Sequence, residues 1–208
     1  MSIFVVEGVN GAGKSTVGHL VERAVRDADE HCMFLDPASH GALGEVVRDH
    51  LLSPNRHHTP DADALLFATL RVSGLREIIG TVPADMEAIV ILERWSLALA
   101  AYGAVDGVRS ELINEVTLVL SSVAAIDHTI LLDVPGEVAH ARLQQTESRN
   151  RFEIQGAEYL EEVAAAYRRL ALESPGVSIV DASGSVEATV GRALESLRAG
   201  SKASCFAR

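Results

Sequence analysis

The sequence has few of the residues that build disulfide-rich or membrane-spanning proteins. Its 208 residues include two cysteines, Cys32 and Cys205, whose spacing fits neither a disulfide framework nor a metal site. No apolar run is long enough to span a membrane, and the first seven residues read as a core strand rather than as a basic leader. These absences predict a cytoplasmic protein without a membrane partner.

Basic residues are also scarce. The chain has 18 Lys and Arg against 29 Asp and Glu, a formal net charge of −11 at pH 7. Binding a nucleic-acid polymer needs many Lys and Arg contacts to phosphates, so the composition predicts no such partner. A small phosphorylated ligand is still compatible, because it needs only a local cluster of cations and salt screens charges beyond about 8 Å.

Aromatic residues make up only 4% of the chain, although 48% of the residues are hydrophobic. The core must therefore be mostly Ala, Val, Leu and Ile, which suits strands buried on both faces under helices. No Pro-, Gly- or Ser-rich linker divides the sequence, so we expect a single domain over residues 1–198. Residues 199–208 lose apolar periodicity and are expected to form a flexible tail.

Short apolar runs alternate with longer segments of helical period. This alternation predicts an α/β fold, with a parallel sheet covered by helices on both faces. The predicted strands are residues 3–6, 32–35, 88–92, 129–133 and 177–180. The predicted helices are residues 14–27, 43–52, 61–80, 108–123, 136–144, 157–173 and 186–197.

Residues 8–15 read GVNGAGKS and form a complete phosphate-binding loop between the first predicted strand and the first predicted helix. Its glycines let successive backbone N–H groups point at phosphate oxygens, at the positive end of the helix. Lys14 is expected to reach the β- and γ-phosphates of ATP, and Ser15 to hold Mg²⁺. The predicted cofactor-binding residues are Gly8, Asn10, Gly11, Ala12, Gly13, Lys14, Ser15 and Thr16.

Ligands of open α/β sheets bind beyond the carboxyl ends of the strands, where this chain places polar residues. Glu93 and Arg94 follow the apolar run 88–92. Glu93 could hold the Mg²⁺ water shell or accept a proton, and Arg94 could clamp phosphate oxygens bidentately. An ordinary ion pair is the alternative for these two residues.

Residues 144–153 contain two arginines, Arg149 and Arg151, in a stretch with little apolar periodicity. A mobile lid near residues 144–156 would exclude water and bring an arginine to the transferring phosphoryl group. A solvated charged loop is the alternative.

Three further residues are candidates for binding an acceptor. Asp36 ends the second predicted strand and could act on the acceptor or on Mg²⁺, although a turn-forming Asp explains it equally well. Phe67 and Arg71 are four residues apart on a predicted helix and therefore share a face. Together they could stack on a base and donate to its carbonyl. A core phenylalanine and a surface arginine are the alternative.

Taken in order, several segments resemble the thymidylate kinase family of nucleoside monophosphate kinases. The segments that carry the resemblance are residues 7–16, 65–71, 89–95, 100–102 and 150–153. The resemblance implies a P-loop kinase fold with a five-stranded parallel sheet, transfer of the γ-phosphoryl group of ATP to dTMP with Mg²⁺, and a homodimer. It also implies that Phe67 stacks on the base, Arg71 donates to it, Arg94 clamps phosphate and Tyr102 packs against the deoxyribose.

The chain departs from the family pattern mainly on the acceptor side. Asn10 stands where the family usually has an acidic residue that binds the sugar 3′-hydroxyl, and Leu35 where it has a phosphate-binding arginine. Ala98 and Leu99 replace polar residues that help to read thymine, and Glu93 replaces the commoner aspartate. Two alternatives therefore stay open: a deoxynucleoside kinase, whose acceptor carries no phosphate, and a nucleotide-binding module without kinase activity.

Overall fold

A computed structural model describes residues 1–53, 58–83, 85–145, 152 and 154–206, with side chains as far as Ser201. All five predicted strands are confirmed. They are β1 (Ser2–Glu7), β2 (His31–Leu35), β3 (Ala88–Glu93), β4 (His128–Asp133) and β5 (Val177–Asp181).

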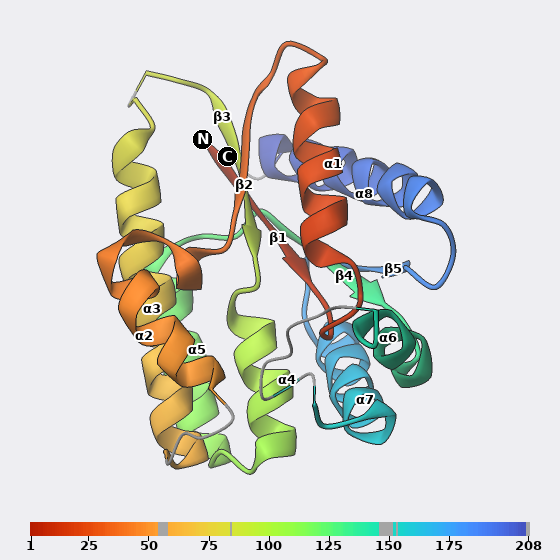
Figure 1. Ribbon diagram of the computed structural model, residues 1–208. Coiled ribbons are helices and arrows are strands. Elements are labelled where there is room, and N and C mark those ends of the chain that lie inside the picture. Colours follow the sequence, from red (N-terminus) through yellow and green to blue (C-terminus); the bar gives the residue numbers. More distant parts are fainter. Residues whose placement is uncertain (54–57, 84, 146–151, 153, 207–208) are drawn as a thin grey trace.

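Helices separate these strands along the chain, as the periodicity predicts (Figure 1). They are α1 (Lys14–Arg26), α2 (Gly41–Leu52), α3 (Pro60–Thr81), α4 (Ser96–Asp106), α5 (Ser110–Val123), α6 (Gly136–Leu143), α7 (Ala157–Glu173) and α8 (Val186–Phe206), with a short 3₁₀ helix η1 (Pro37–Ser39) after β2. Among the described residues, no helix is both long enough and apolar enough to cross a membrane.

The strands form one parallel sheet in the order β2-β3-β1-β4-β5. In its register, Phe4 of β1 pairs with Ile91 of β3 on one side and with His128 of β4 on the other. The chain leaves β1 toward one edge of the sheet and later crosses to the other edge. A parallel sheet that reverses direction in this way opens a crevice at the carboxyl ends of the strands.

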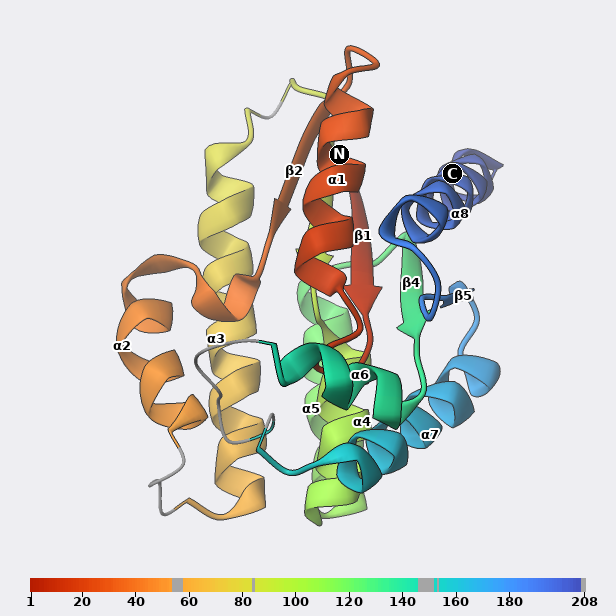
Figure 2. The ribbon, with the colours of Figure 1, turned by 45° about the vertical axis from the view of Figure 1, so that its right-hand side comes forward.

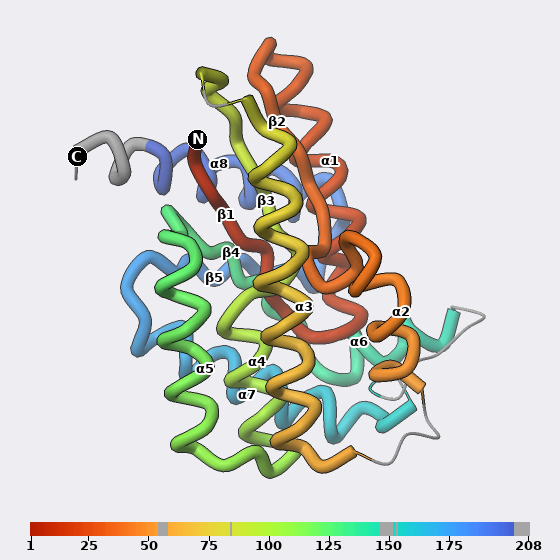
Figure 3. The backbone as a smooth tube through the Cα atoms, turned by 90° about the vertical axis from the view of Figure 1, so that its left-hand side faces the viewer, coloured from red at the N-terminus to blue at the C-terminus, as the bar shows by residue number. Residues whose placement is uncertain are grey.

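Successive side chains of a strand point to opposite faces, so each strand feeds two cores. Phe4 and Val6 of β1 pack with residues of α1 and α8, whereas Ile3 and Val5 pack with residues of α3 and α5. Figure 3 shows α3 and α5 side by side over their face of the sheet. Helices α4, α6 and α7 lie around the carboxyl ends of the strands (Figure 1).

Helix α4 is not among the helices that the sequence predicts. Residues 97–101 read LALAA, and Ala98, Leu99 and Ala101 are all buried. Because α4 begins three residues after β3 and its first turns are mostly Ala and Leu, it reads in the sequence as a continuation of the apolar run 88–92 rather than as a separate helix. This helix carries Tyr102, one of the predicted acceptor-binding residues.

The last helix is longer than predicted. The periodicity ends the helix at residue 197, but α8 continues to Phe206, across most of the segment expected to be a tail. Gly200 is buried against His128 of β4, so close that an added Cβ would lie 2.5 Å from the His128 Cβ atom. A glycine contact of this kind leaves no apolar side chain for the periodicity to detect.

Candidate active site

The phosphate-binding loop joins β1 to α1 and lies beside α6 (Figure 2). Gly11 has a φ of 83°, and a Cβ atom there would lie 2.3 Å from the carbonyl oxygen of Ala139 on α6. Gly13, with a φ of 90°, occupies the residue before the first turn of α1. At Gly11, only glycine allows both the left-handed backbone and the close approach of α6. At Gly13, glycine is favoured by the left-handed backbone alone.

Lys14 begins α1 and is 5% exposed. Its Nζ atom donates to the carbonyl oxygen of Val9 at 3.0 Å and lies 4.0 Å from Oε1 of Glu93. Burial, and then the positive charge of Arg94, lower the pKa of Lys14 to about 7, against the opposing effect of Glu93. An anion bound to the loop would supply the close negative partner that this ammonium group lacks.

Ser15 and Glu93 meet at the carboxyl end of the sheet. The Ser15 hydroxyl donates to Oε2 of Glu93 at 2.7 Å. A hydroxyl and a carboxylate oxygen, close to a phosphate-binding loop, are the kinds of ligand that Mg²⁺ takes together with phosphate oxygens and water. The donor set therefore fits the predicted magnesium site.

Arg94 directly follows β3 and is held from several sides. Its backbone has a φ of 68°, and its N–H donates to the carbonyl oxygen of Val6 at 3.0 Å. The guanidinium donates to the Asn10 side-chain oxygen, to the Tyr167 hydroxyl at 3.1 Å and to the Tyr102 hydroxyl at 3.5 Å. Because arginine only donates, its contact identifies the Asn10 atom as the oxygen.

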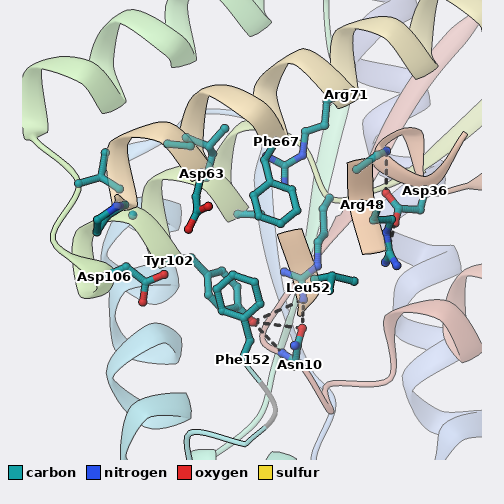
Figure 4. Close-up of a pocket in the computed structure, with 18 residues that line it drawn as sticks. Asn10, Asp36, Arg48, Leu52, Asp63, Phe67, Arg71, Tyr102, Asp106 and Phe152 are labelled. Atoms are coloured by element: carbon teal, nitrogen blue, oxygen red, sulfur yellow. Dashed lines mark hydrogen bonds and ion pairs between the residues drawn. The ribbon is translucent and has the colours of Figure 1, made fainter. Parts of the chain in front are cut away.

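An acceptor-side cavity lies between α3 and α4, and Phe67 and Arg71 project into it from α3 (Figure 4). Arg71 is 4% exposed, and its Nε and Nη1 atoms have no hydrogen-bond partner among the described residues. Its Cζ atom lies 5.8 Å from the centre of the Phe67 ring. Burial lowers the pKa of this guanidinium, which adds to the advantage of a ligand with an acceptor atom.

Two more aromatic rings close this cavity. Tyr102 faces α3 from α4, and its ring centre lies 5.1 Å from that of Phe152. Phe152 in turn lies 6.2 Å from Phe67. A flat ring stacked on Phe67 would therefore be surrounded by aromatic and small apolar side chains, among them Ala98 and Leu99.

Asp36 lines the same cavity, but its carboxylate is already engaged. It accepts the N–H of Ala38 at 2.9 Å and the Ser39 hydroxyl at 2.7 Å, as a turn-forming Asp does. It also accepts from Nη2 of Arg48 on α2 at 3.2 Å. Arg48 is a site residue that the sequence analysis missed, although it is the only arginine of the predicted helix that follows Asp36.

The second cavity, on the loop side, extends from Lys14 to the loop after β5. Arg142 of α6 bridges its two walls: the guanidinium donates to the carbonyl oxygen of Ala182 at 2.9 Å and to that of Gly11 at 3.4 Å. Arg142 is not among the predicted site residues either. No local pattern marks it, because its partners lie at distant points of the chain.

The fold brings most of the predicted site residues together. Residues 10–16, Glu93 and Arg94 line the loop-side cavity, and Asp36, Phe67, Arg71, Arg94 and Tyr102 line the acceptor-side cavity. Gly8 lies at the start of the loop and lines neither cavity. Asn10, Arg48 and Arg94 line both, so the two cavities meet at these three side chains. Arg149 and Arg151, the predicted lid arginines, lie outside the described residues.

Comparisons with known proteins agree with this geometry. The chain matches the family model for thymidylate kinase over residues 6–192. It is 33% identical to the thymidylate kinase of Nitrosomonas europaea over 181 residues, which cover 86% of this chain and 83% of that protein. It is 34% identical to the thymidylate kinase of Symbiobacterium thermophilum over 192 residues, which cover 90% and 88%. A phosphate-binding loop alone occurs in many families, but similarity along nearly the whole length places this chain in the thymidylate kinase family.

Proposed function

We propose that this chain transfers the γ-phosphoryl group of ATP to dTMP and so forms dTDP and ADP. Membership of the family makes it an ATP-dependent nucleoside monophosphate kinase. The observation that carries the proposal for this site is that the loop-side and acceptor-side cavities meet at Asn10, Arg48 and Arg94. A phosphoryl group held at that junction can contact both ligands.

On the loop side, we assign the triphosphate to the loop itself. Backbone N–H groups and the start of α1 would bind the phosphates, and Lys14 would stabilise the charge that develops on the γ-phosphoryl group. Arg142 would flank the adenine on one side. The loop after β5, to which Arg142 donates at the Ala182 carbonyl oxygen, would flank it on the other. The flat guanidinium offers a face on which an adenine ring can stack.

Ser15 and Glu93 would hold the magnesium ion that accompanies ATP. An Mg²⁺ ion held there would neutralise negative charge on the phosphates during transfer. The hydrogen bond between Ser15 and Glu93 keeps both oxygen atoms at one place beside Lys14. The chain's own contribution is therefore to present these two oxygens close to the phosphates.

On the acceptor side, the base would stack on Phe67 and accept hydrogen bonds from Arg71. Tyr102 would pack against the deoxyribose, and Arg94 would bind the acceptor phosphate. Asp36 acts through Arg48, whose guanidinium it holds at the junction of the cavities. We propose Arg149 and Arg151 as further arginines that reach the transferring group.

Arg48 also bears on whether the acceptor is a nucleotide or a nucleoside. Leu35 stands where the family has a phosphate-binding arginine. The sequence alone therefore indicates only Arg94 as a ligand of the acceptor phosphate. The structure adds Arg48, from a different element, on the wall shared by both cavities. Two arginines at one point favour a phosphate-bearing acceptor over a neutral hydroxyl group.

A coupled assay of ADP formation across deoxynucleosides and their monophosphates tests this function. We expect rapid ADP formation only with dTMP or a close analogue. Comparable turnover with thymidine and none with dTMP would establish the nucleoside kinase alternative. Tight ATP binding without turnover on any acceptor would establish a nucleotide-binding module instead.

We also propose that the chain forms a homodimer, as the family resemblance implies. Helix α5 supports this because Leu118 and Val119 on its surface are 71% and 53% exposed. A second copy of the chain packed on α5 would remove these apolar side chains from water. Light scattering after gel filtration measures the mass directly, and a mass of one chain at micromolar concentration would contradict the proposal.

A further inference from the structure

A buried hydrogen-bonded chain connects Arg94 to the core. Arg94 Nη1 lies 3.1 Å from the Tyr167 hydroxyl, and that hydroxyl lies 3.0 Å from Oε2 of Glu7. Tyr167 is 1% exposed and Glu7 is fully buried. The three residues come from distant parts of the sequence: the end of β1, the residue after β3 and the middle of α7.

The direction of each hydrogen bond in this chain is fixed. A guanidinium can only donate and a carboxylate can only accept, so the Tyr167 hydroxyl must accept from Arg94 and donate to Glu7. Burial, and then the nearby charge of Glu7, raise the pKa of Tyr167 well above its ordinary value, which keeps the proton on the hydroxyl. The hydroxyl thus has one arrangement, and it points a lone pair at Arg94.

Glu7 fixes the backbone beside Arg94 as well. Its Oε1 atom accepts the N–H of Trp95 at 2.7 Å and the N–H of Ala98 at 3.1 Å, at the start of α4. One carboxylate therefore holds the main chain that follows Arg94 and, through Tyr167, the side chain of Arg94. This double anchorage opposes the tendency of a residue with a φ of 68° to relax.

We propose that Tyr167 is a positioning residue for Arg94, and that Glu7 anchors it, so that the pair sets where the Arg94 guanidinium holds the acceptor phosphate. This role rests on the proposed function, in which Arg94 binds that phosphate. Tyr167 itself does not line either cavity. Its hydroxyl reaches the site through Arg94, whereas its ring packs on Tyr102, with 6.2 Å between the ring centres.

Tyr167→Phe removes the hydroxyl and keeps the ring. We expect kcat/KM for dTMP to fall about tenfold, the effect of losing a hydrogen bond to a charged group, while KM for ATP changes less than about twofold. Arg169→Gln is the control on the same helix, because Arg169 is exposed and lines neither cavity. The control should change both parameters less than about twofold.

A double-mutant cycle with Arg94→Met separates positioning from a general structural role. In the Arg94→Met background, Tyr167→Phe should change kcat/KM for dTMP less than about twofold, because its target is gone. The same tenfold loss in both backgrounds, or equal losses toward dTMP and ATP, would overturn the positioning role. If Arg94→Met alone kept the wild-type kcat/KM for dTMP, Arg94 would not bind the acceptor phosphate. The proposed role of Tyr167 would then fail as well.

Glu7→Gln provides a second route if Tyr167→Phe does not fold. In one orientation the amide N–H₂ group faces the N–H groups of Trp95 and Ala98, which are donors. In the other it faces the Tyr167 hydroxyl, which would then accept from residue 7 instead of donating to it. We therefore expect the same selective loss of kcat/KM for dTMP. Unchanged kinetics in Glu7→Gln, with a melting temperature equal to that of the wild type, would refute the anchoring role.

Discussion

Arg71 and Lys14 are nearly excluded from solvent, and neither has a carboxylate of the described residues within hydrogen-bond distance. Lys14 Nζ lies 4.0 Å from Oε1 of Glu93, and Nε and Nη1 of Arg71 have no partner among the described residues. Burial disfavours the charged form of both groups and lowers their pKa values, and at Lys14 the positive charge of Arg94 adds to this effect. At the scale of the residue, the site is arranged for ligands that bring the missing negative atoms.

Replacing Lys14 by alanine should therefore damage catalysis rather than folding. We expect Lys14→Ala to lower kcat by about a hundredfold or more, because the γ-phosphoryl group loses its main protein partner in the transition state. Its melting temperature should stay close to that of the wild type. Arg198→Ala, which removes an exposed charge on α8, is the control. Retention of more than about a tenth of kcat, less than 1.4 kcal/mol of barrier, would contradict the role of Lys14.

Arg48 gives a second prediction at this scale. Arg48→Gln removes a cation from the junction of the cavities and frees the Asp36 carboxylate, so we expect KM for dTMP to rise about tenfold. KM for ATP should change less than about threefold. Steady-state kinetics with each substrate varied in turn measure both values. Arg76→Gln, on the exposed face of α3, serves as control. An equal rise of both KM values would show that Arg48 does not distinguish the acceptor.

At the scale of the element, the contact between α3 and η1 determines where Asp36 and Arg48 lie. An added Cβ atom on Gly74 of α3 would be 1.9 Å from the carbonyl oxygen of Pro37 in η1. No other residue allows the helix to approach this backbone so closely. The contact joins α3, which carries Phe67 and Arg71, to η1. Asp36, which holds Arg48, directly precedes η1.

Gly74→Ala should therefore disturb both stability and acceptor binding. We expect a loss of about 2 kcal/mol of unfolding free energy from overpacking and a raised KM for dTMP. Gly80→Ala is the matched control in the same helix, since an added Cβ there meets nothing within 4 Å. That variant should be unchanged or more stable by about 0.5–1 kcal/mol. Urea unfolding measures both, and equal effects of the two variants would exclude the contact as the cause.

Element types were more predictable from the sequence than site residues were. Each strand is a short apolar run and seven helices lie in longer segments between the strands, but α4 is short, begins three residues after β3 and is mostly Ala and Leu in its first turns, so it does not stand out from the strand before it. The phosphate-binding loop is local in sequence, so all its residues could be named. Arg48, Arg142 and Tyr167 act across long sequence separations, and only the packing of α2, α6 and α7 brings them to the site.

At the scale of the whole molecule, the charge is divided unevenly. The chain carries a net charge of −11, yet more cations than carboxylates line the two cavities. The cations are Lys14, Arg48, Arg71, Arg94 and Arg142, and the carboxylates are Asp36, Asp63, Glu93 and Asp106. An acidic surface repels nucleotides, whereas this cluster of cations attracts them at close range. Because salt screens distant charges more than partly buried ones, the cluster dominates binding at physiological ionic strength.

The sheet also contains an acid-sensitive contact far from the cavities. Burial lowers the pKa of His128 on β4, whose Nε2 atom lies 2.8 Å from the Ser178 hydroxyl of β5 and 3.3 Å from the Ser196 hydroxyl of α8. The unfolded chain, with an ordinary histidine pKa near 6.5, takes up the proton first. The contribution of neutral His128 is therefore complete above pH 6.5 and is lost as the pH falls below that value.

His128→Gln should reduce this dependence on pH. We expect the unfolding free energy of the wild type to fall more between pH 7.5 and pH 5.5 than that of the variant, whose side chain does not titrate. Urea unfolding at the two pH values measures the difference. If both proteins lose the same stability over this range, His128 does not contribute to it.

The left-handed backbone at Arg94 has an evolutionary consequence. A residue with a side chain is less favourable in this conformation than glycine by about 1–2 kcal/mol. Selection for thermal stability alone would favour glycine or asparagine at position 94. Selection for kinase activity favours arginine, whose guanidinium binds the acceptor phosphate in the proposed function. Libraries sorted first by survival at high temperature and then by nucleotide synthesis should therefore enrich different residues at this position.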